Sequence, residues 1–163
     1  MENPNKLHVD QSISFRALGT TYKVLSESVG GSLAIVEHTL EAKSIGAPLH
    51  KHTYENETSY VLEGELSVIQ DGEVQTARPG QYIVKPQGIF HTFWNATDQR
   101  IRFIEIITPG NFENYYAEIA PFLLSGQPPQ REKLAEAAAK YGLIMDMAAT
   151  EEIIRKHGLK PLS

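Results

Sequence analysis

The sequence has no cysteine among its 163 residues, which excludes disulfide bonds, thiolate nucleophiles and sulfur ligands. Any metal ion must therefore be held by nitrogen and oxygen atoms. The sequence also lacks an apolar run near the ~20 residues that a membrane span needs, and residues 1–10 show neither the basic nor the apolar stretch of a signal peptide. We therefore expect a cytoplasmic protein with no membrane partner.

Basic residues are in the minority. The 15 Lys and Arg stand against 20 Asp and Glu, which gives a formal net charge of −5. A mildly acidic chain offers no broad cationic surface to a phosphate backbone, so nucleic acid is not expected as a partner. The length suits one domain with one core, since folded domains most often have roughly 100–200 residues.

Residues 12–108 read as short strands separated by Gly, Pro and Asp, which is typical of an all-β fold. Apolar and polar side chains alternate clearly over residues 32–38, and Asp71-Gly72 predicts a hairpin turn between two more strands. Seven or more such strands need a sandwich or a barrel to cover their apolar faces. Further strands are predicted at residues 21–25, 57–63, 81–85, 91–95 and 101–107.

After Gly110 the apolar spacing changes from that of strands to that of helices. Apolar residues between Phe112 and Leu123 form one helical stripe, and residues 131–141 predict a second helix. A third helix is predicted to be capped by Thr150 and to end before Gly158. We expect the β-barrel to occupy residues 1–110 and a helical extension, residues 111–163, to pack on it within the same domain.

A group of three histidines and one glutamate has the spacing of a metal site. His50 and His52 are two residues apart in extended chain, so their side chains leave the same face. Glu57 follows at the head of the next strand, which Gly64 ends, and His91 follows a Pro-x-Gly turn. Three imidazoles and one carboxylate suit Fe, Mn, Ni, Co, Cu or Zn, with positions left open for substrate and for oxygen or water.

The two segments that carry these residues resemble the two motifs of the cupin superfamily. Segment 80–95 matches the second motif at its Gly, Pro, Gly, His and Asn positions with the family's spacing. Segment 46–64 resembles the first motif, except that Ser44 stands where the family has its leading glycine. Two jointly matched motifs are far more specific than one. The resemblance implies a jelly-roll β-barrel with one divalent transition metal, and it leaves a homodimer open.

Several other residues have predicted places. Phe93 leaves the same strand face as His91, and Ser59 and Val61 leave the same face as Glu57, so they line either a pocket or an ordinary core. Both faces of strand 101–107 mix charge with apolar bulk, so the sequence does not decide which face points inward. A structural role is expected for His8, His38 and His157.

The sequence from Thr108 onward is loosely similar to small cupins related to quercetin dioxygenases. This similarity implies a dioxygenase that acts on a phenolic, flavonol-like or otherwise enolisable compound, with Glu57 as both metal ligand and catalytic proton acceptor. The alternatives are a redox-neutral isomerase, decarboxylase or lyase, and a non-catalytic small-molecule-binding cupin. A helix-turn-helix around residues 134–143 is disfavoured, because a helix that reads DNA needs cationic flanks.

Overall fold

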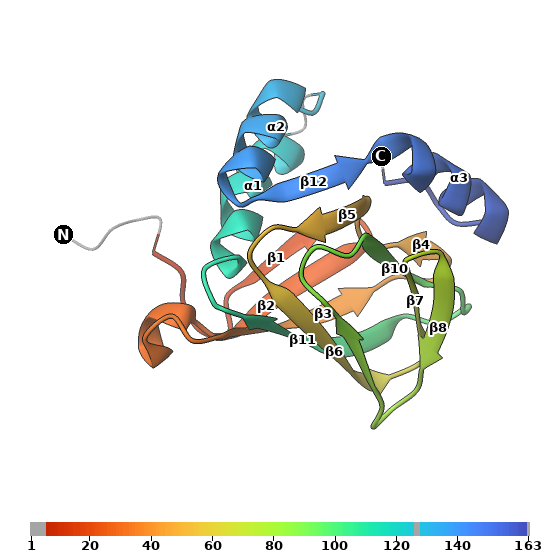
Figure 1. Cartoon of the computed structure of the whole chain (residues 1–163), viewed down its shortest axis with the longest axis horizontal. Coiled ribbons are helices and arrows are strands. Elements are labelled where there is room, and N and C mark those ends of the chain that lie inside the picture. The colour runs from red at the N-terminus through yellow and green to blue at the C-terminus, as the bar shows by residue number, and fades with distance from the viewer. Residues whose placement is uncertain (1–5, 126–127, 163) are drawn as a thin grey trace.

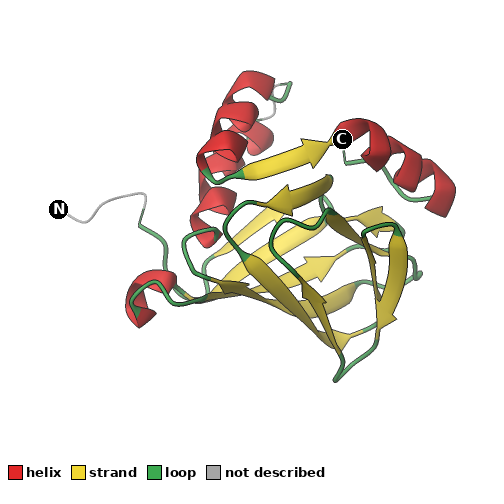
Figure 2. Cartoon of the chain, viewed as in Figure 1, coloured by secondary structure: helices red, strands yellow, loops and turns green. Residues whose placement is uncertain are grey.

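The computed structural model of the protein describes residues 6–125 and 128–162 (Figure 1). Its helices are α1 (Glu113–Leu124), α2 (Arg131–Lys140) and α3 (Met147–His157), with a short 3-10 helix at Ser26–Val29. Figure 2 shows the three α-helices gathered on one side of a body made of strands. The strands are β1 (Ser12–Phe15), β2 (Leu18–Val24), β3 (Ala34–Leu40), β4 (Ser44–Ile45), β5 (Leu49–His52), β6 (Asn56–Glu63), β7 (Leu66–Gln70), β8 (Glu73–Ala77), β9 (Tyr82–Lys85), β10 (His91–Asn95), β11 (Ile101–Thr108) and β12 (Leu143–Asp146).

The strands form two antiparallel sheets, as in a jelly roll. One sheet has the order β1-β2-β3-β11-β6-β9, and the other has the order β12-β5-β10-β7-β8, with β4 paired to β10. This arrangement confirms the predicted all-β class with a helical tail. The predicted barrel needs one correction: among the described strands no ladder joins one sheet to the other, so hydrogen bonds do not close the structure.

The strands predicted from alternation are confirmed. Along β3 every second residue is buried, as expected for a strand with one face toward the core. Asp71 and Gly72 link β7 to β8 with φ values of 49° and 79°, the left-handed conformations that tight hairpins favour. The sequence does not predict β1, β4 or β12, and it predicts β5 only as extended chain.

The three predicted tail helices are confirmed, but the last one begins earlier than expected. Asp146 caps α3 by accepting a hydrogen bond from Ala149 N at 2.9 Å. Thr150 lies inside the helix, where its hydroxyl donates to the Asp146 carbonyl at 2.6 Å, so the prediction of Thr150 as the cap is wrong. Gly158 ends the helix at φ 62°, as predicted.

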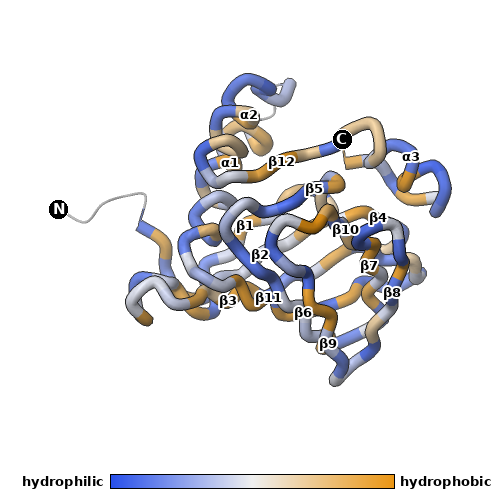
Figure 3. The backbone as a smooth tube through the Cα atoms, in the orientation of Figure 1, coloured by the Kyte–Doolittle hydropathy of each residue, from blue (hydrophilic) through white to orange (hydrophobic). Residues whose placement is uncertain are grey.

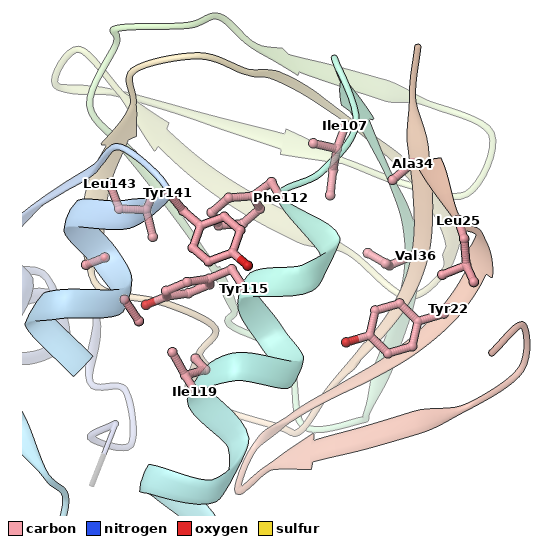
Figure 4. Packing of buried hydrophobic residues seen from close by; sticks show 12 residues of the cluster. Tyr22, Leu25, Ala34, Val36, Ile107, Phe112, Tyr115, Ile119, Tyr141 and Leu143 are labelled. Atoms are coloured by element: carbon pink, nitrogen blue, oxygen red, sulfur yellow. The ribbon is translucent and has the colours of Figure 1, made fainter. Parts of the chain in front are cut away.

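An aromatic cluster joins the tail to the first sheet (Figure 4). Tyr22 and Val36 of that sheet share a buried cluster with Phe112 and Tyr115 at the start of the tail and with Tyr141 after α2. Figure 3 shows α2 as mainly hydrophilic, in keeping with a helix that buries only a narrow face. Because one cluster draws residues from both parts of the chain, we propose that the strands and the tail form a single domain.

The inward face of β11, which the sequence leaves open, carries Phe103, Glu105 and Ile107, all of them buried. Gly46, which begins the segment that resembles the first cupin motif, has a packing role, because a Cβ added there would lie 1.9 Å from the ring of Phe93. Gly46 therefore leaves the space that this ring fills. No helix in the described part of the chain is long and apolar enough to cross a membrane.

Candidate metal centre

Three strands bring the predicted ligands together. His50 and His52 project from β5, His91 from β10 of the same sheet, and Glu57 from β6 of the opposite sheet. His91 lies directly across the ladder from His50. All four residues are buried, and one ligand atom from each lies within 4.8 Å of the others. This group can hold a metal ion.

The inner ring nitrogens and the carboxylate converge on a common point. His50 Nε2 and His52 Nε2 are 3.2 Å apart. Glu57 reaches two of the rings: its Oε1 lies 3.5 Å from His52 Nε2, and its Oε2 lies 3.2 Å from His91 Nε2. The four side chains therefore form one cluster rather than two separate pairs.

Backbone carbonyls fix the outer nitrogens of two of the rings. His50 Nδ1 lies 2.7 Å from the carbonyl oxygen of Pro48, and His91 Nδ1 lies 3.1 Å from that of Ile89. Because a carbonyl can only accept a hydrogen bond, each Nδ1 must carry the proton and donate it. In a neutral ring this leaves a lone pair on Nε2, aimed into the cluster.

These lone pairs fit a bound cation. With no proton on His50 Nε2, its close approach to His52 Nε2 is favourable only if His52 Nε2 carries a proton or a metal cation lies between them. On its outer side, His52 Nδ1 faces Glu55 Oε2 at 3.3 Å, an ion-pair distance without hydrogen-bond geometry. Imidazole nitrogens backed by carbonyl and carboxylate oxygens are typical of transition-metal ligands.

Without a metal, a proton on His52 supplies the positive charge. Burial opposes that charge, but Glu57 and Glu55 outweigh burial and raise the pKa of His52 to about 9. Burial, with the two neighbouring rings, lowers the pKa of His50 well below its usual value, and burial lowers the pKa of His91. A metal must therefore displace a proton from His52 at neutral pH.

A buried ionic network stands behind Glu57. Lys85 Nζ lies 3.2 Å from Glu57 Oε2 and 2.7 Å from Glu105 Oε2, to which Ser59 also donates a hydrogen bond at 2.9 Å. Burial would raise the pKa of Glu57, but Lys85 and His52 hold the pKa of this carboxyl well below its usual range. Burial raises the pKa of Glu105 to about 7, against the lowering effect of Lys85.

Sequence reasoning missed Lys85 and Glu105. One signal was available for Lys85: it is two residues past Ile83 on β9, so it shares that residue's buried face. For Glu105 the sequence gives no comparable signal, because its strand is equally mixed on both faces. The face becomes known only from the register, in which Glu105 pairs with Ser59 of β6.

The unpredicted strand β12 supports the strand that carries two of the ligands. In the β12–β5 ladder, Leu143 lies opposite His52, and Met145 lies opposite His50. Thr150 of α3 accepts a hydrogen bond from Leu49 N at 2.8 Å through its hydroxyl oxygen. The helical tail therefore helps to position His50 and His52.

An aromatic side chain from the tail also reaches the ligands. The ring of Phe112 meets the ring of His52 edge-on, with their centres 4.5 Å apart. Phe93, Ser59 and Val61 are buried on the predicted faces. Among the described residues, the ligand group does not include His8, His38 or His157.

Comparisons with known proteins agree with this arrangement. Residues 36–107 match the family model described as "Cupin domain". The solved structure of KdgF from Halomonas sp. is similar with a TM-score of 0.56 at 18% identity, and the match covers 63% of this chain and 89% of that chain. A predicted oxalate decarboxylase from Thermotoga maritima gives a TM-score of 0.55 at 21% identity and covers 62% and 92%.

A third solved structure, a sugar phosphate isomerase from a cupin superfamily of Silicibacter pomeroyi, has a TM-score of 0.51 at 24% identity and covers 58% of this chain and 60% of that chain. At such identities the likeness shows the fold. No curated protein matches the sequence. The family model, the jelly-roll sheets and both motifs agree, so residues 36–107 form a cupin domain.

Proposed function

We propose that the protein binds one divalent transition metal through His50, His52, Glu57 and His91 and is a metal-dependent enzyme acting on a small molecule. The observation that carries this proposal is the convergence of three imidazoles and one carboxylate in a buried group. It is supported by the carbonyls that fix the outer nitrogens of two of the rings. Fe, Mn, Ni, Co, Cu and Zn all accept such donors.

The residues of the site have separate roles in this proposal. A bound metal would polarise a substrate oxygen and, if redox-active, exchange electrons with dioxygen. The histidines stay as fixed ligands. Glu57, which Lys85 and His52 keep ionised, is the carboxylate placed to accept a proton from a substrate hydroxyl. Phe112, which packs against His52, limits the access of water from the side of the tail.

For the reaction we propose oxygenation of a phenolic or otherwise enolisable compound. The loose similarity to quercetin dioxygenase-like cupins supports this choice. The aromatic side chains near the ligands, Phe93 and Phe112, also suit a planar substrate that needs few polar contacts.

A redox-neutral isomerase, decarboxylase or lyase is the second candidate. The contact between Glu57 and Lys85 favours it, because it places a proton acceptor and a proton donor side by side, and such a pair can move a proton without any change of oxidation state. The names of two similar structures, a predicted oxalate decarboxylase and a sugar phosphate isomerase, agree with chemistry of this kind. A binding protein without catalytic activity is the third candidate.

The test combines metal analysis with oxygen uptake. Protein produced without added metal is analysed for bound ions and is then assayed on a panel of catechols, flavonols and diketones. We expect about one metal ion per chain and oxygen consumption with one class of compound. Turnover at the same rate in anaerobic buffer would reject the dioxygenase and favour the redox-neutral enzyme. Bound metal without turnover of any compound would favour the binding protein.

A further inference from the structure

Lys85 is an unusual residue for the interior of a jelly roll. It is only 1% exposed, yet its ammonium group lies among inward-facing side chains of the first sheet. Its only salt-bridge partners among the described residues are Glu57 and Glu105. A lysine is almost never fully buried unless it is paired, so these two carboxylates must balance the buried positive charge of Lys85.

Packing and stability do not account for this network. A buried ion pair generally stabilises a fold no better than apolar side chains of similar volume do. The network is also incompletely satisfied, since Glu105 Oε1 is buried without a hydrogen-bond partner among the described residues. Half-satisfied polar networks are worse for stability than an apolar core. An apolar residue at position 85 would match the neighbouring Ile83 and Phe93.

The order of charges gives the network a direction. Lys85 lies between two carboxylates, with Glu57 on the side of the ligands and Glu105 on the other. Lys85 and Glu57 meet through Oε2, the same oxygen that faces His91. The ammonium group of Lys85 therefore neutralises part of the negative charge that Glu57 would offer a metal. Glu105 in turn offsets part of the positive charge of that ammonium group.

We propose that Lys85 and Glu105 are positioning residues that act through Glu57: Lys85 weakens Glu57 as a metal ligand, and Glu105 moderates this effect. The inference rests on the metal site proposed above. A weakly held carboxylate can leave the metal for a substrate proton and return, which a tightly bound one does less readily. The pair thus sets how much Glu57 serves as ligand and how much as proton acceptor.

The two charges predict opposite effects on metal affinity. In Lys85→Met the positive charge beside Glu57 is lost, so the dissociation constant for Mn²⁺ or Zn²⁺ should fall by ~10-fold. In Glu105→Gln the positive charge loses its counter-charge, and the dissociation constant should rise by ~10-fold. A network that merely maintained the fold would weaken binding in both variants.

The experiment measures the affinity of full-length wild-type protein and both variants by competition with a chelator, with thermal unfolding of each metal-free protein as the check on folding. Glu113→Gln is the matched control, because Glu113 is another buried carboxylate, hydrogen-bonded to Ser26 outside the ligand group. It should lower thermal stability and leave metal affinity within ~3-fold of wild type.

The double variant Lys85→Met/Glu105→Leu decides the matter if either single variant does not fold, because replacing both partners avoids an unpaired buried charge. Affinity at or above that of wild type supports the proposal. A loss of ~10-fold or more in the double variant, or weaker binding in both single variants, overturns it. If wild-type protein binds no metal, the proposed function itself fails, and that result is distinct from either of these.

Discussion

The interior between the two sheets has two regions of opposite character, built from the same strands. Near the candidate ligands, the inward positions of β6, β9 and β11 carry charge, whereas further along the same faces they are apolar and belong to one continuous core cluster. The charged set is Glu57, Lys85 and Glu105, and the apolar set is Val61, Ile83 and Phe103.

The two regions are expected to have different roles, one in stability and the other in chemistry. Each fully buried apolar side chain contributes about 1.5–3 kcal/mol to the free energy of unfolding, so the apolar region holds the sheets together. Burying charge costs free energy, which paired charges recover only in part. The charged region is therefore expected to contribute little to stability and to carry the chemistry, and substitutions in the two regions should have different effects.

The largest effect is expected at Glu57. Glu57→Gln keeps the shape of the side chain and removes its basicity, and loss of a general base typically lowers turnover by ~10²–10⁴-fold. Three imidazoles still remain, so metal content should survive in part. Metal stoichiometry and turnover number, measured together on the substrate found by the panel, check this. Near-normal turnover with the metal in place would reduce Glu57 to a spectator ligand.

A substitution in the apolar region should produce the reverse pattern. Phe103 is fully buried against Phe93 and His38, and Phe103→Ala should lower the free energy of unfolding by about 3–5 kcal/mol. Metal stoichiometry of the folded protein should stay at the wild-type level. Denaturant unfolding and elemental analysis provide the two measurements. A stable variant that has lost its metal would show that the two regions are not separable in this way.

The pH dependence of metal affinity should report the proton on His52. The pKa of His52 is raised from 6.5 to about 9, so its proton stabilises the metal-free fold at low pH, and this contribution is lost as pH rises through about 9. A metal binds only the deprotonated ring, so the apparent affinity should fall by about tenfold for each pH unit below 9. Titrations with Ni²⁺ at pH 7 and pH 8 test the slope. Equal affinities would mean that no proton is displaced.

The smallest effect is expected where the tail supports β5. Thr150→Val keeps the volume of the side chain but leaves Leu49 N without its acceptor, which should cost about 1–3 kcal/mol of unfolding free energy. Thermal or denaturant unfolding measures the loss.

A fragment that ends at residue 110 removes the whole tail instead of one of its contacts, so it should lose more stability than Thr150→Val does. If that fragment were monomeric and as stable as the full chain, the single-domain proposal would be wrong.

The sequence was informative where the signal is local. The candidate ligands lie in two short motifs, and alternation over a few residues was enough to predict β3 and the Asp71-Gly72 hairpin. The fold class and the candidate ligand group can therefore be predicted from local sequence patterns.

The sequence failed where the outcome depends on distant pairing. Leu143 to Asp146 has no clear alternation, and it becomes a strand only because β5 offers a free edge. The inward place of Glu105 depends on the register of β11 against β6, which no local pattern sets. Thr150 has the chemistry of a helix cap, but Asp146, four residues earlier, takes that place.

The most direct test of the account is the metal content of wild-type protein and of His50→Ala, His52→Ala and His91→Ala. Wild-type protein should contain about one divalent transition metal ion per chain, and each substitution should weaken binding by about 10²-fold or more, since four ligands share a binding free energy of roughly 10–16 kcal/mol. Elemental analysis after dialysis should then find most of the metal lost from all three variants. Full retention of the metal in any two of them, with the fold intact, would contradict the proposed site.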